Sequence, residues 1–124
     1  MISGSGKLEV VISEDSPIAN YHEKLTGCSY FWLQYDQINE YKYWRNYRDF
    51  GIWFANNHWR IGDLEDKGTE ACFIKAPGSS DQLPTDLEGQ WMYKNQYTQE
   101  WIKAGNDIFV QFRNELRFDK NGSK

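Results

Sequence analysis

The chain has 124 residues, a formal net charge of −4 and a pI near 5.1. This length fits one domain with a single core, and the acidic balance argues against a general nucleic-acid binder, which carries a surplus of Lys and Arg. No run of roughly 18 apolar residues exists, so the sequence predicts no transmembrane helix, and the N-terminus lacks the apolar region of a signal peptide.

Aromatic residues carry much of the apolar content. Phe, Tyr and Trp together number 21, whereas Leu, Ile and Val number 19. Because the core of such a domain needs more large apolar side chains than the aliphatic residues supply, many of the aromatics must be structural. The aromatic and β-branched bias, together with frequent Gly, Asn and Asp, favours strands and turns over helices.

The predicted elements are short strands separated by polar turns. The first strand is predicted at residues 7–12, KLEVVI, with every second side chain apolar, and a polar connection containing Pro17 follows it. Further strands are predicted where apolar runs end at Gly, Pro, Asn or Asp, at residues 28–33, 41–44, 71–76, 90–93, 101–102 and 108–112. Residues 63–70 are predicted to form a charged turn, and residues 77–89 a loop.

A central hairpin is predicted within residues 41–62, around Asn56-Asn57. Two consecutive asparagines tolerate the positive φ that a type I′ turn requires at both central positions. In that register Ala55 faces His58, and alternation divides the flanking side chains between two faces. The core face would carry Ile52, Phe54, Trp59 and Ile61, and the opposite face Trp53, His58 and Arg60.

Together these elements predict an all-β fold, either a small antiparallel β-sandwich or a partly open barrel of about eight or nine short strands. The aromatic-rich β domain is expected at residues 7–112, and a polar C-terminal tail at residues 113–124. The polar ends favour a domain cut from a larger protein over a native chain with loose termini. Helical turns are expected only in the loop before Gly89 and in the tail.

No catalytic constellation emerges. The two histidines, His22 and His58, stand in a polar loop and beside the hairpin turn, with no nucleophile motif around them. Carboxylates that could in principle serve glycoside cleavage show no selective spacing, namely Asp36, Glu40, Asp49, Asp86 and Glu88. We therefore expect no enzyme, no cofactor and no catalytic residues.

An acidic loop raises the alternative of a calcium site. It contains Asp63, Glu65, Asp66 and Glu70. In an EF-hand with Gly68 at the sixth position, the bidentate Glu of the twelfth would be replaced by Ile74. A different site that adds Asp81 or Asp86 stays open, but a solvated turn is the preferred interpretation, and we expect no metal.

The two cysteines, Cys28 and Cys72, leave two alternatives open. Both lie in apolar, strand-like runs, so they could be buried thiols that behave as small hydrophobic residues. If they instead formed a disulfide, closing this loop would contribute roughly 4 kcal/mol in the chain-entropy model and would favour an extracellular location. No spacing of Cys and His indicates zinc.

Exposed aromatic rings beside Arg and Asn suit ligand binding. The candidate ligand-binding residues are Tyr43, Tyr47, Trp53, His58 and Arg60, with Trp44, Arg45 and Arg48 nearby. Of these, the hairpin would place Trp53, His58 and Arg60 away from the core. The alternative interpretation is that Trp44 is a core residue and that Trp53 and Arg60 form a cross-strand cation–π pair worth about 0.5–1 kcal/mol.

The order of short motifs resembles a group of small tryptophan-rich β domains found in multidomain proteins of invertebrates and protists. These motifs are LTGCSYFW, INEYKYW, WRIGD, ACFIKA and LPTD, followed by QWMYKNQYTQEW and DIFVQF, over residues 8–112. The resemblance implies a non-enzymatic interaction or adhesion module and carries no catalytic residues. We therefore expect a domain for protein–protein interaction or structural assembly, with carbohydrate binding as the alternative and single-stranded nucleic acid as an unfavoured third.

Overall fold

The structure is a computed structural model that describes residues 6–113. Over these residues nine strands form one antiparallel sheet, in the order β8-β7-β6-β5-β4-β3-β2-β1-β9. The strands are β1 (Lys7–Ile12), β2 (Gly27–Leu33), β3 (Trp44–Arg45), β4 (Phe50–Ala55), β5 (His58–Asp63), β6 (Ile74–Pro77), β7 (Met92–Lys94), β8 (Trp101–Lys103) and β9 (Ile108–Phe112).

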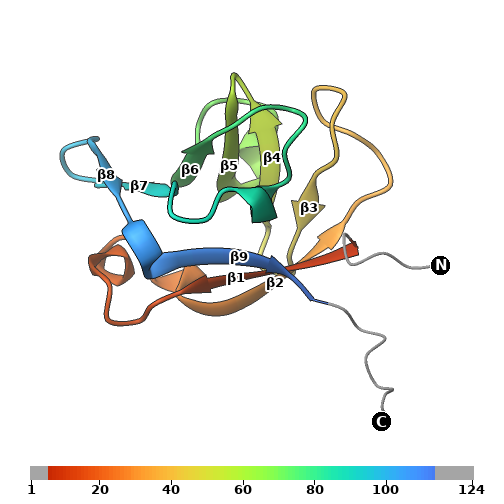
Figure 1. The fold of residues 1–124 in the computed structure, drawn as a ribbon. Helices are drawn as coiled ribbons and strands as arrows, with labels where there is room; N and C mark the ends of the chain where they lie inside the picture. The colour runs from red at the N-terminus through yellow and green to blue at the C-terminus, as the bar shows by residue number, and fades with distance from the viewer. Residues whose placement is uncertain (1–5, 114–124) are drawn as a thin grey trace, which may run out of the picture.

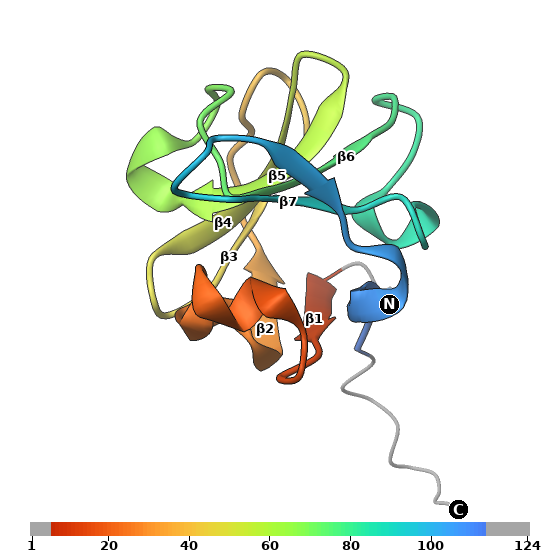
Figure 2. The ribbon, with the colours of Figure 1, turned by 90° about the vertical axis from the view of Figure 1, so that its left-hand side faces the viewer.

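The sheet curls into a half-barrel. Each strand from β1 to β7 pairs with the next along the chain, while β9 returns to pair with β1, so β8 and β9 form the two edges. The strands β9, β1 and β2 form one layer below the strands β3 to β8 (Figure 1). Figure 2 shows the same curl from the side of β7 and β8. The predicted all-β class and partly open barrel are therefore confirmed.

Alternation along the strands fills the inside of the half-barrel. Leu8, Val10 and Ile12 point inward from β1, as predicted, and are completely or almost completely buried. The aromatic core is built from edge-to-face contacts, with Trp44 and Trp59 at a ring-centroid distance of 6.0 Å. Burying each such side chain contributes about 1.5–3 kcal/mol relative to leaving it exposed, so the aromatics hold the two layers together.

The central hairpin has the predicted turn and register. Asn56 and Asn57 have φ values of 48° and 62°, the left-handed conformation that a type I′ turn requires. Across the turn Ala55 pairs with His58 and Phe54 with Trp59. Every residue of β4 is buried, which makes this hairpin the best-enclosed part of the sheet.

Two predicted strands are shorter than expected. Only Trp44 of the predicted strand 41–44 belongs to β3, because Tyr41 instead bridges to Ile38 across a tight turn. The two residues of that turn, Asn39 and Glu40, also have positive φ. Likewise β6 begins at Ile74 rather than at residue 71, because the preceding residues cross the outside of the hairpin.

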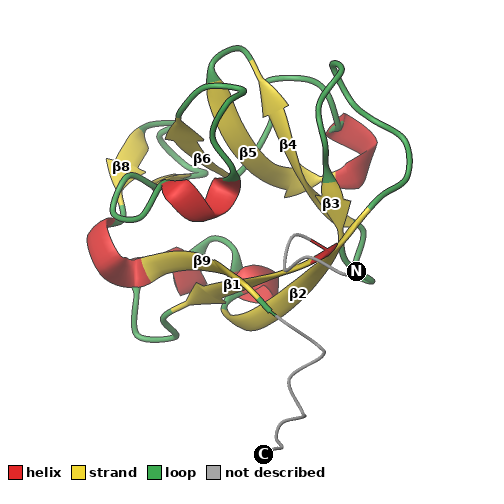
Figure 3. Ribbon diagram, turned by 45° about the vertical axis from the view of Figure 1, so that its right-hand side comes forward, coloured by secondary structure: helices red, strands yellow, loops and turns green. Residues whose placement is uncertain are grey.

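Five short 3₁₀ turns lie in the connections between strands (Figure 3). They are η2 (Pro17–Asn20), η3 (Glu23–Leu25), η4 (Leu64–Asp66), η5 (Pro84–Asp86) and η6 (Gly105–Asp107). The Ser16 hydroxyl accepts a hydrogen bond from the Ile18 amide at 3.1 Å and starts η2. Of the five, η5 lies in the loop before Gly89, where a helical turn was expected. The predicted tail lies outside the described residues from residue 114 onward.

Candidate functional site

The outer face of the central hairpin was the predicted ligand-binding face. Trp53 and Arg60 do point away from the inside of the half-barrel, as the alternation argument required. However, Trp53 is 0% exposed and Arg60 is 2% exposed. The expectation that these two side chains lie on a solvent face is therefore wrong.

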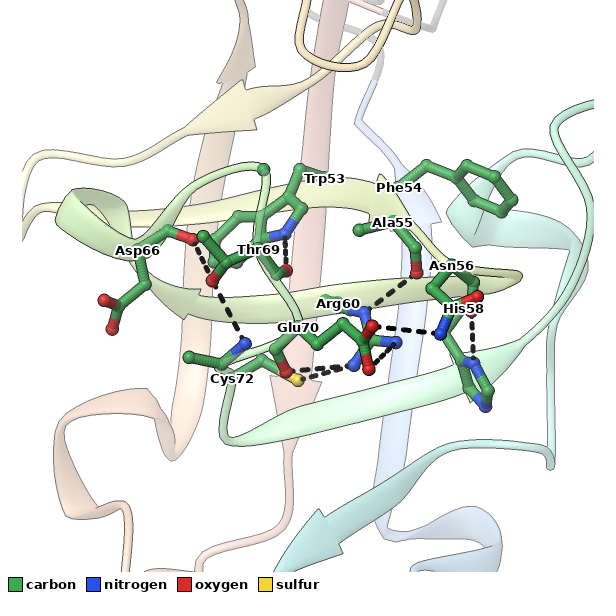
Figure 4. A network of polar contacts seen from close by, with 12 residues as sticks. Trp53, Phe54, Ala55, Asn56, His58, Arg60, Asp66, Thr69, Glu70 and Cys72 are labelled. Atoms are coloured by element: carbon green, nitrogen blue, oxygen red, sulfur yellow. Dashed lines mark hydrogen bonds and ion pairs between the residues drawn. The ribbon is translucent and has the colours of Figure 1, made fainter.

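A segment that we call the strap, residues 64–72, covers this face (Figure 4). The Trp53 indole Nε1–H donates to the carbonyl oxygen of Thr69 at 2.8 Å. The Arg60 guanidinium donates from Nε to the Ala55 carbonyl at 2.9 Å and from Nη1 to the Glu70 carbonyl at 3.0 Å. These bonds bind the strap to β4 and β5, so the hairpin has a second buried layer where a binding face was expected.

The packing under the strap leaves no room for a ligand. A Cβ atom built on Gly62 would lie 2.9 Å from the Cα atom of Cys72, so the backbones of β5 and the strap are in direct contact. Cys72, Trp53, Ala55, Ile38 and Tyr43 form one buried cluster there. No cation–π contact joins Trp53 to Arg60; the guanidinium instead donates to the carbonyl oxygens of Ala55 on β4 and Glu70 on the strap.

The remaining predicted residues are not brought together either. Tyr43 is buried, and its hydroxyl donates to Asp36 Oδ1 at 2.8 Å. Burial, followed by this hydrogen bond, raises the pKa of Tyr43. His58 is half-buried, with its Nδ1 atom 3.0 Å from the Asn56 carbonyl oxygen. Only Tyr47 is fully accessible, at 88% exposure.

A different aromatic surface surrounds Tyr47, and we call it the β2 aromatic face: Tyr30, Trp32 and Tyr47. On β2, Phe31 points into the core, so its neighbours Tyr30 and Trp32 point outward. The rings of Trp32 and Tyr47 are in contact, with centroids 4.8 Å apart and planes tilted by 37°. Lys7 Nζ lies over both strand residues, 4.7 Å from the Tyr30 ring and 5.4 Å from the Trp32 ring.

Asn46 fixes the turn that presents Tyr47. Its buried side-chain oxygen accepts hydrogen bonds from the amides of Arg48 and Phe50, both at 2.9 Å. This is the local bonding by which Asn closes a turn, and Asp49 completes it with a φ of 65°. The residues between β3 and β4 are thus held so that Tyr47 and Arg48 project into solvent.

Two hollows adjoin the β2 aromatic face and share Trp32, Asn46 and Tyr47. One has a volume of about 220 Å³ and the other about 330 Å³. The first is also lined by Lys24 and Arg48, among other residues, and the second by Gln34 and Arg45. The lining contains three cationic side chains and no Asp or Glu, although the whole chain has a net charge of −4.

A third hollow, of about 410 Å³, lies beside His22 and includes Phe50, Asp63 and Phe73. His22 is buried, and the Lys94 carbonyl oxygen lies 3.1 Å from its Nε2 atom. Since a carbonyl can only accept, Nε2 carries the proton and Nδ1 accepts from the Gln96 amide at 3.3 Å. Burial lowers the pKa of His22. Both ring nitrogens are engaged in holding loops together, which is a structural arrangement.

The described residues contain no group of three or more His, Cys, Asp or Glu side chains that could hold a metal ion. Within the same part of the chain, no helix is long and apolar enough to cross a membrane. Both cysteines are free thiols, Cys28 exposed on β2 and Cys72 buried at the end of the strap. The disulfide alternative is therefore wrong, because the strands β3 and β4 stand between β2 and the β5–β6 region in the sheet.

Tyr30 and Trp32 were not predicted as site residues because residues 28–33 are mostly apolar, so the sequence does not show which of them point outward. The signal that could have revealed them is the pairing of β1 with β2, which places Trp32 opposite Lys7 and Tyr30 opposite Glu9. An outward charged residue on β1 implies an outward partner on β2. A long connection after Ile12 separates β1 from β2, so the sequence alone does not fix which residues of the two strands pair.

Comparison of the chain with known protein families, with curated proteins and with solved structures found no match. The resemblance to small tryptophan-rich β domains stays a prediction. Function is therefore inferred from the geometry of the site.

Proposed function

We propose that this domain is a non-enzymatic module that binds another protein through the β2 aromatic face. The observation that carries the proposal is the contact between Trp32 and Tyr47 on the surface, 4.8 Å between ring centroids and flanked by Arg45 and Arg48. Trp, Tyr and Arg are the residues that most often dominate the binding energy of protein interfaces. A protein does not need a surface cluster of Trp, Tyr and Arg side chains in order to be soluble.

The rigidity of its support favours this role. Trp32 stands where β2 is paired with both β1 and β3, and Tyr30 stands where β2 is paired with β1, so both lie on a backbone fixed by the sheet. Asn46 holds the turn that carries Tyr47. A preorganised surface loses little conformational entropy when a partner binds, and this small entropy cost favours higher affinity.

Carbohydrate binding is the second candidate function. It is favoured by the exposed ring of Tyr47 at the border of two hollows that also offer Gln34, Asn46 and Arg45 for hydrogen bonds. It ranks second because Lys7 and Tyr47 already lie against the Trp32 ring, which leaves one ring rather than two for stacking on a sugar.

The test compares Tyr47→Ala with Tyr97→Ala, a second well-exposed tyrosine in the β7–β8 turn. Tagged wild-type and variant domains are used for quantitative affinity capture from the source organism, and captured proteins are then purified and titrated by calorimetry. We expect a direct partner whose Kd rises by about 30-fold or more with Tyr47→Ala, the effect of a hot spot, and is unchanged with Tyr97→Ala.

Two results would contradict the proposal. If Tyr47→Ala and Trp32→Ala both retain every direct partner with unaltered Kd, the β2 aromatic face is not the interface. If a glycan array gives binding that Tyr47→Ala abolishes, while no protein partner depends on Tyr47, carbohydrate binding replaces protein binding as the function.

A further inference from the structure

The two hollows beside Tyr47 have a charge opposite to that of the molecule. They are lined by Lys24, Arg45 and Arg48 and by no carboxylate, whereas the chain has a net charge of −4. A positively charged patch on an acidic protein favours a partner whose contacting surface is negatively charged. We infer that the partner presents an acidic, extended peptide segment to the β2 aromatic face; this inference rests on the proposed function.

The cations are placed to receive carboxylates. Arg48 donates to the Lys24 carbonyl from Nη1 at 3.3 Å, a contact that holds the guanidinium over the smaller hollow. Arg45 contacts Asp49 at 3.4 Å, with the two side chains 44% and 80% exposed. Such an exposed pair contributes little energy, so an incoming carboxylate can replace Asp49. Guanidinium groups bind carboxylates with two parallel hydrogen bonds, which adds geometric specificity.

The two hollows share the lining residues Trp32, Asn46 and Tyr47, so one extended chain can enter both. Tyr47, with its ring 88% exposed, belongs to the lining of both hollows. In an extended peptide, side chains i and i+2 lie on the same side, about 7 Å apart. Two acidic side chains at this spacing can straddle the ring, one approaching Arg45 and the other Arg48 and Lys24. The hollows, about 220 and 330 Å³, accept side chains rather than a folded domain.

The same charge pattern disfavours a nucleic acid. Affinity for a polyanion grows with the number of phosphates neutralised, and only three cations line these hollows. Beyond Asp49 the surface becomes acidic, with Asp63, Glu65 and Lys67 lining the next hollow. A strand of nucleic acid continuing in that direction would meet carboxylates, whereas a short acidic peptide would end before them.

The experiment selects peptides and then measures them. The intact 124-residue chain is used to pan a displayed library of random peptides, and enriched sequences are synthesised with a fluorescent label. Each is paired with an isosteric variant in which Gln and Asn replace Glu and Asp. We expect enriched peptides to be acidic, with a Kd at least about tenfold lower than that of the amide variant by anisotropy.

Charge-swap variants connect the peptide to the site. Arg48→Glu should weaken the acidic peptide by about tenfold or more and should strengthen a peptide with Lys in place of one acidic residue. Lys103→Glu, an exposed cation on β8, is the matched control and should alter neither Kd. Circular dichroism and thermal unfolding confirm that each variant is folded. Tighter binding of the Lys peptide by Arg48→Glu than by wild type is a result that a purely structural role of Arg48 would not produce.

Three outcomes overturn the inference. Enriched peptides that are neutral or basic, or that bind Arg48→Glu as well as wild type, show that charge does not select the partner. Tighter binding of heparin or oligouridylate than of any peptide, at about 0.15 M salt, assigns the face to a different polyanion. If these peptides depend on Tyr47 without depending on charge, the proposed function stands and only the inference fails. If they bind Tyr47→Ala and Trp32→Ala as tightly as wild type, both are contradicted.

Discussion

Arg60 is a buried cation that donates hydrogen bonds to two backbone carbonyls and, from Nη1 at 3.7 Å, to the Cys72 sulfur. It bonds the carbonyls of Ala55 and Glu70, while the carboxylate of Glu70 lies 4.0 Å away and is 67% exposed. A buried charge costs several kcal/mol of desolvation, and the two carbonyls offset this cost only if the guanidinium fork keeps its geometry. The strap is thus attached by shape and hydrogen bonding more than by an ion pair.

Arg60→Lys is expected to lower the free energy of unfolding by about 1–3 kcal/mol, because an ammonium group cannot reach both carbonyls and leaves a buried acceptor unpaired. Glu70→Gln, the control, removes only a long and exposed ion pair and should cost less than about 1 kcal/mol. Urea unfolding measures both. Equal losses would mean that the carboxylate, rather than the carbonyls, anchors Arg60.

Trp53→Ala tests the second buried layer directly. Since Trp53 is completely buried beneath the strap, its truncation is expected to cost about 3–5 kcal/mol of folding stability. Trp53→Phe keeps most of the packing but loses the bond to the Thr69 carbonyl, so its loss should be smaller. A change in melting temperature close to zero with Trp53→Ala would show that the strap does not enclose the ring in solution.

His22 should make stability depend on pH. Burial lowers its folded pKa below the value of about 6.5 that it has in the unfolded chain. Between these two pKa values the unfolded state binds more protons, so stability is present above about pH 6.5 and is lost as the pH falls toward the folded pKa. His22→Gln should flatten this dependence, measured as the difference in unfolding free energy between pH 7.5 and 5.5. An unchanged difference would assign the pH dependence to other groups.

Among the elements, the β4–β5 hairpin could be predicted because its determinants are local: two asparagines and the alternation on either side of them. The strap could not, because its contact with Trp53 joins residues 16 positions apart through a backbone carbonyl that carries no sequence signature. The β2 aromatic face also escaped, since a long connection separates β1 from β2. The residues that form a turn can be recognised in the sequence, whereas tertiary packing decides whether another segment covers an outward-facing surface.

Asn57→Gly tests the hairpin turn. Because Gly adopts the observed φ of 62° without cost, the change should be neutral or stabilising, and the backbone bond from the Gly78 amide to the carbonyl of residue 57 is kept. Asn57→Val should cost about 1–2 kcal/mol, since a β-branched residue is strained at positive φ. Chemical denaturation compares the two variants. A loss above about 1 kcal/mol with Gly would indicate another turn geometry.

At the scale of the whole molecule, the sheet has a buried layer on each side of its central hairpin. Inside lies the large aromatic core, and outside lies the smaller cluster of Trp53, Tyr43 and Cys72 at the strap. The β2 aromatic face lies elsewhere on the outer surface of the sheet, with Tyr47 exposed and Tyr30 and Trp32 half-buried. The proposed recognition surface, at β2 and the β3–β4 turn, is therefore separate from the hairpin of β4 and β5 that is buried on both sides.

The reactivity of the two free cysteines can show whether the cluster at the strap unfolds together with the aromatic core inside the half-barrel. Cys28 is exposed and should react with a thiol reagent in the folded protein, slowly because its hydrogen bond with Glu9 raises the pKa of the thiol. Cys72 touches the backbone of Gly62 at the end of the strap and should react only after opening. In a Cys28→Ser background, we expect the opening free energy from Cys72 labelling to equal the global value from urea unfolding, because Trp53 and Arg60 bind the strap to the central hairpin. A markedly smaller value would show that the strap opens by itself as a separate unit.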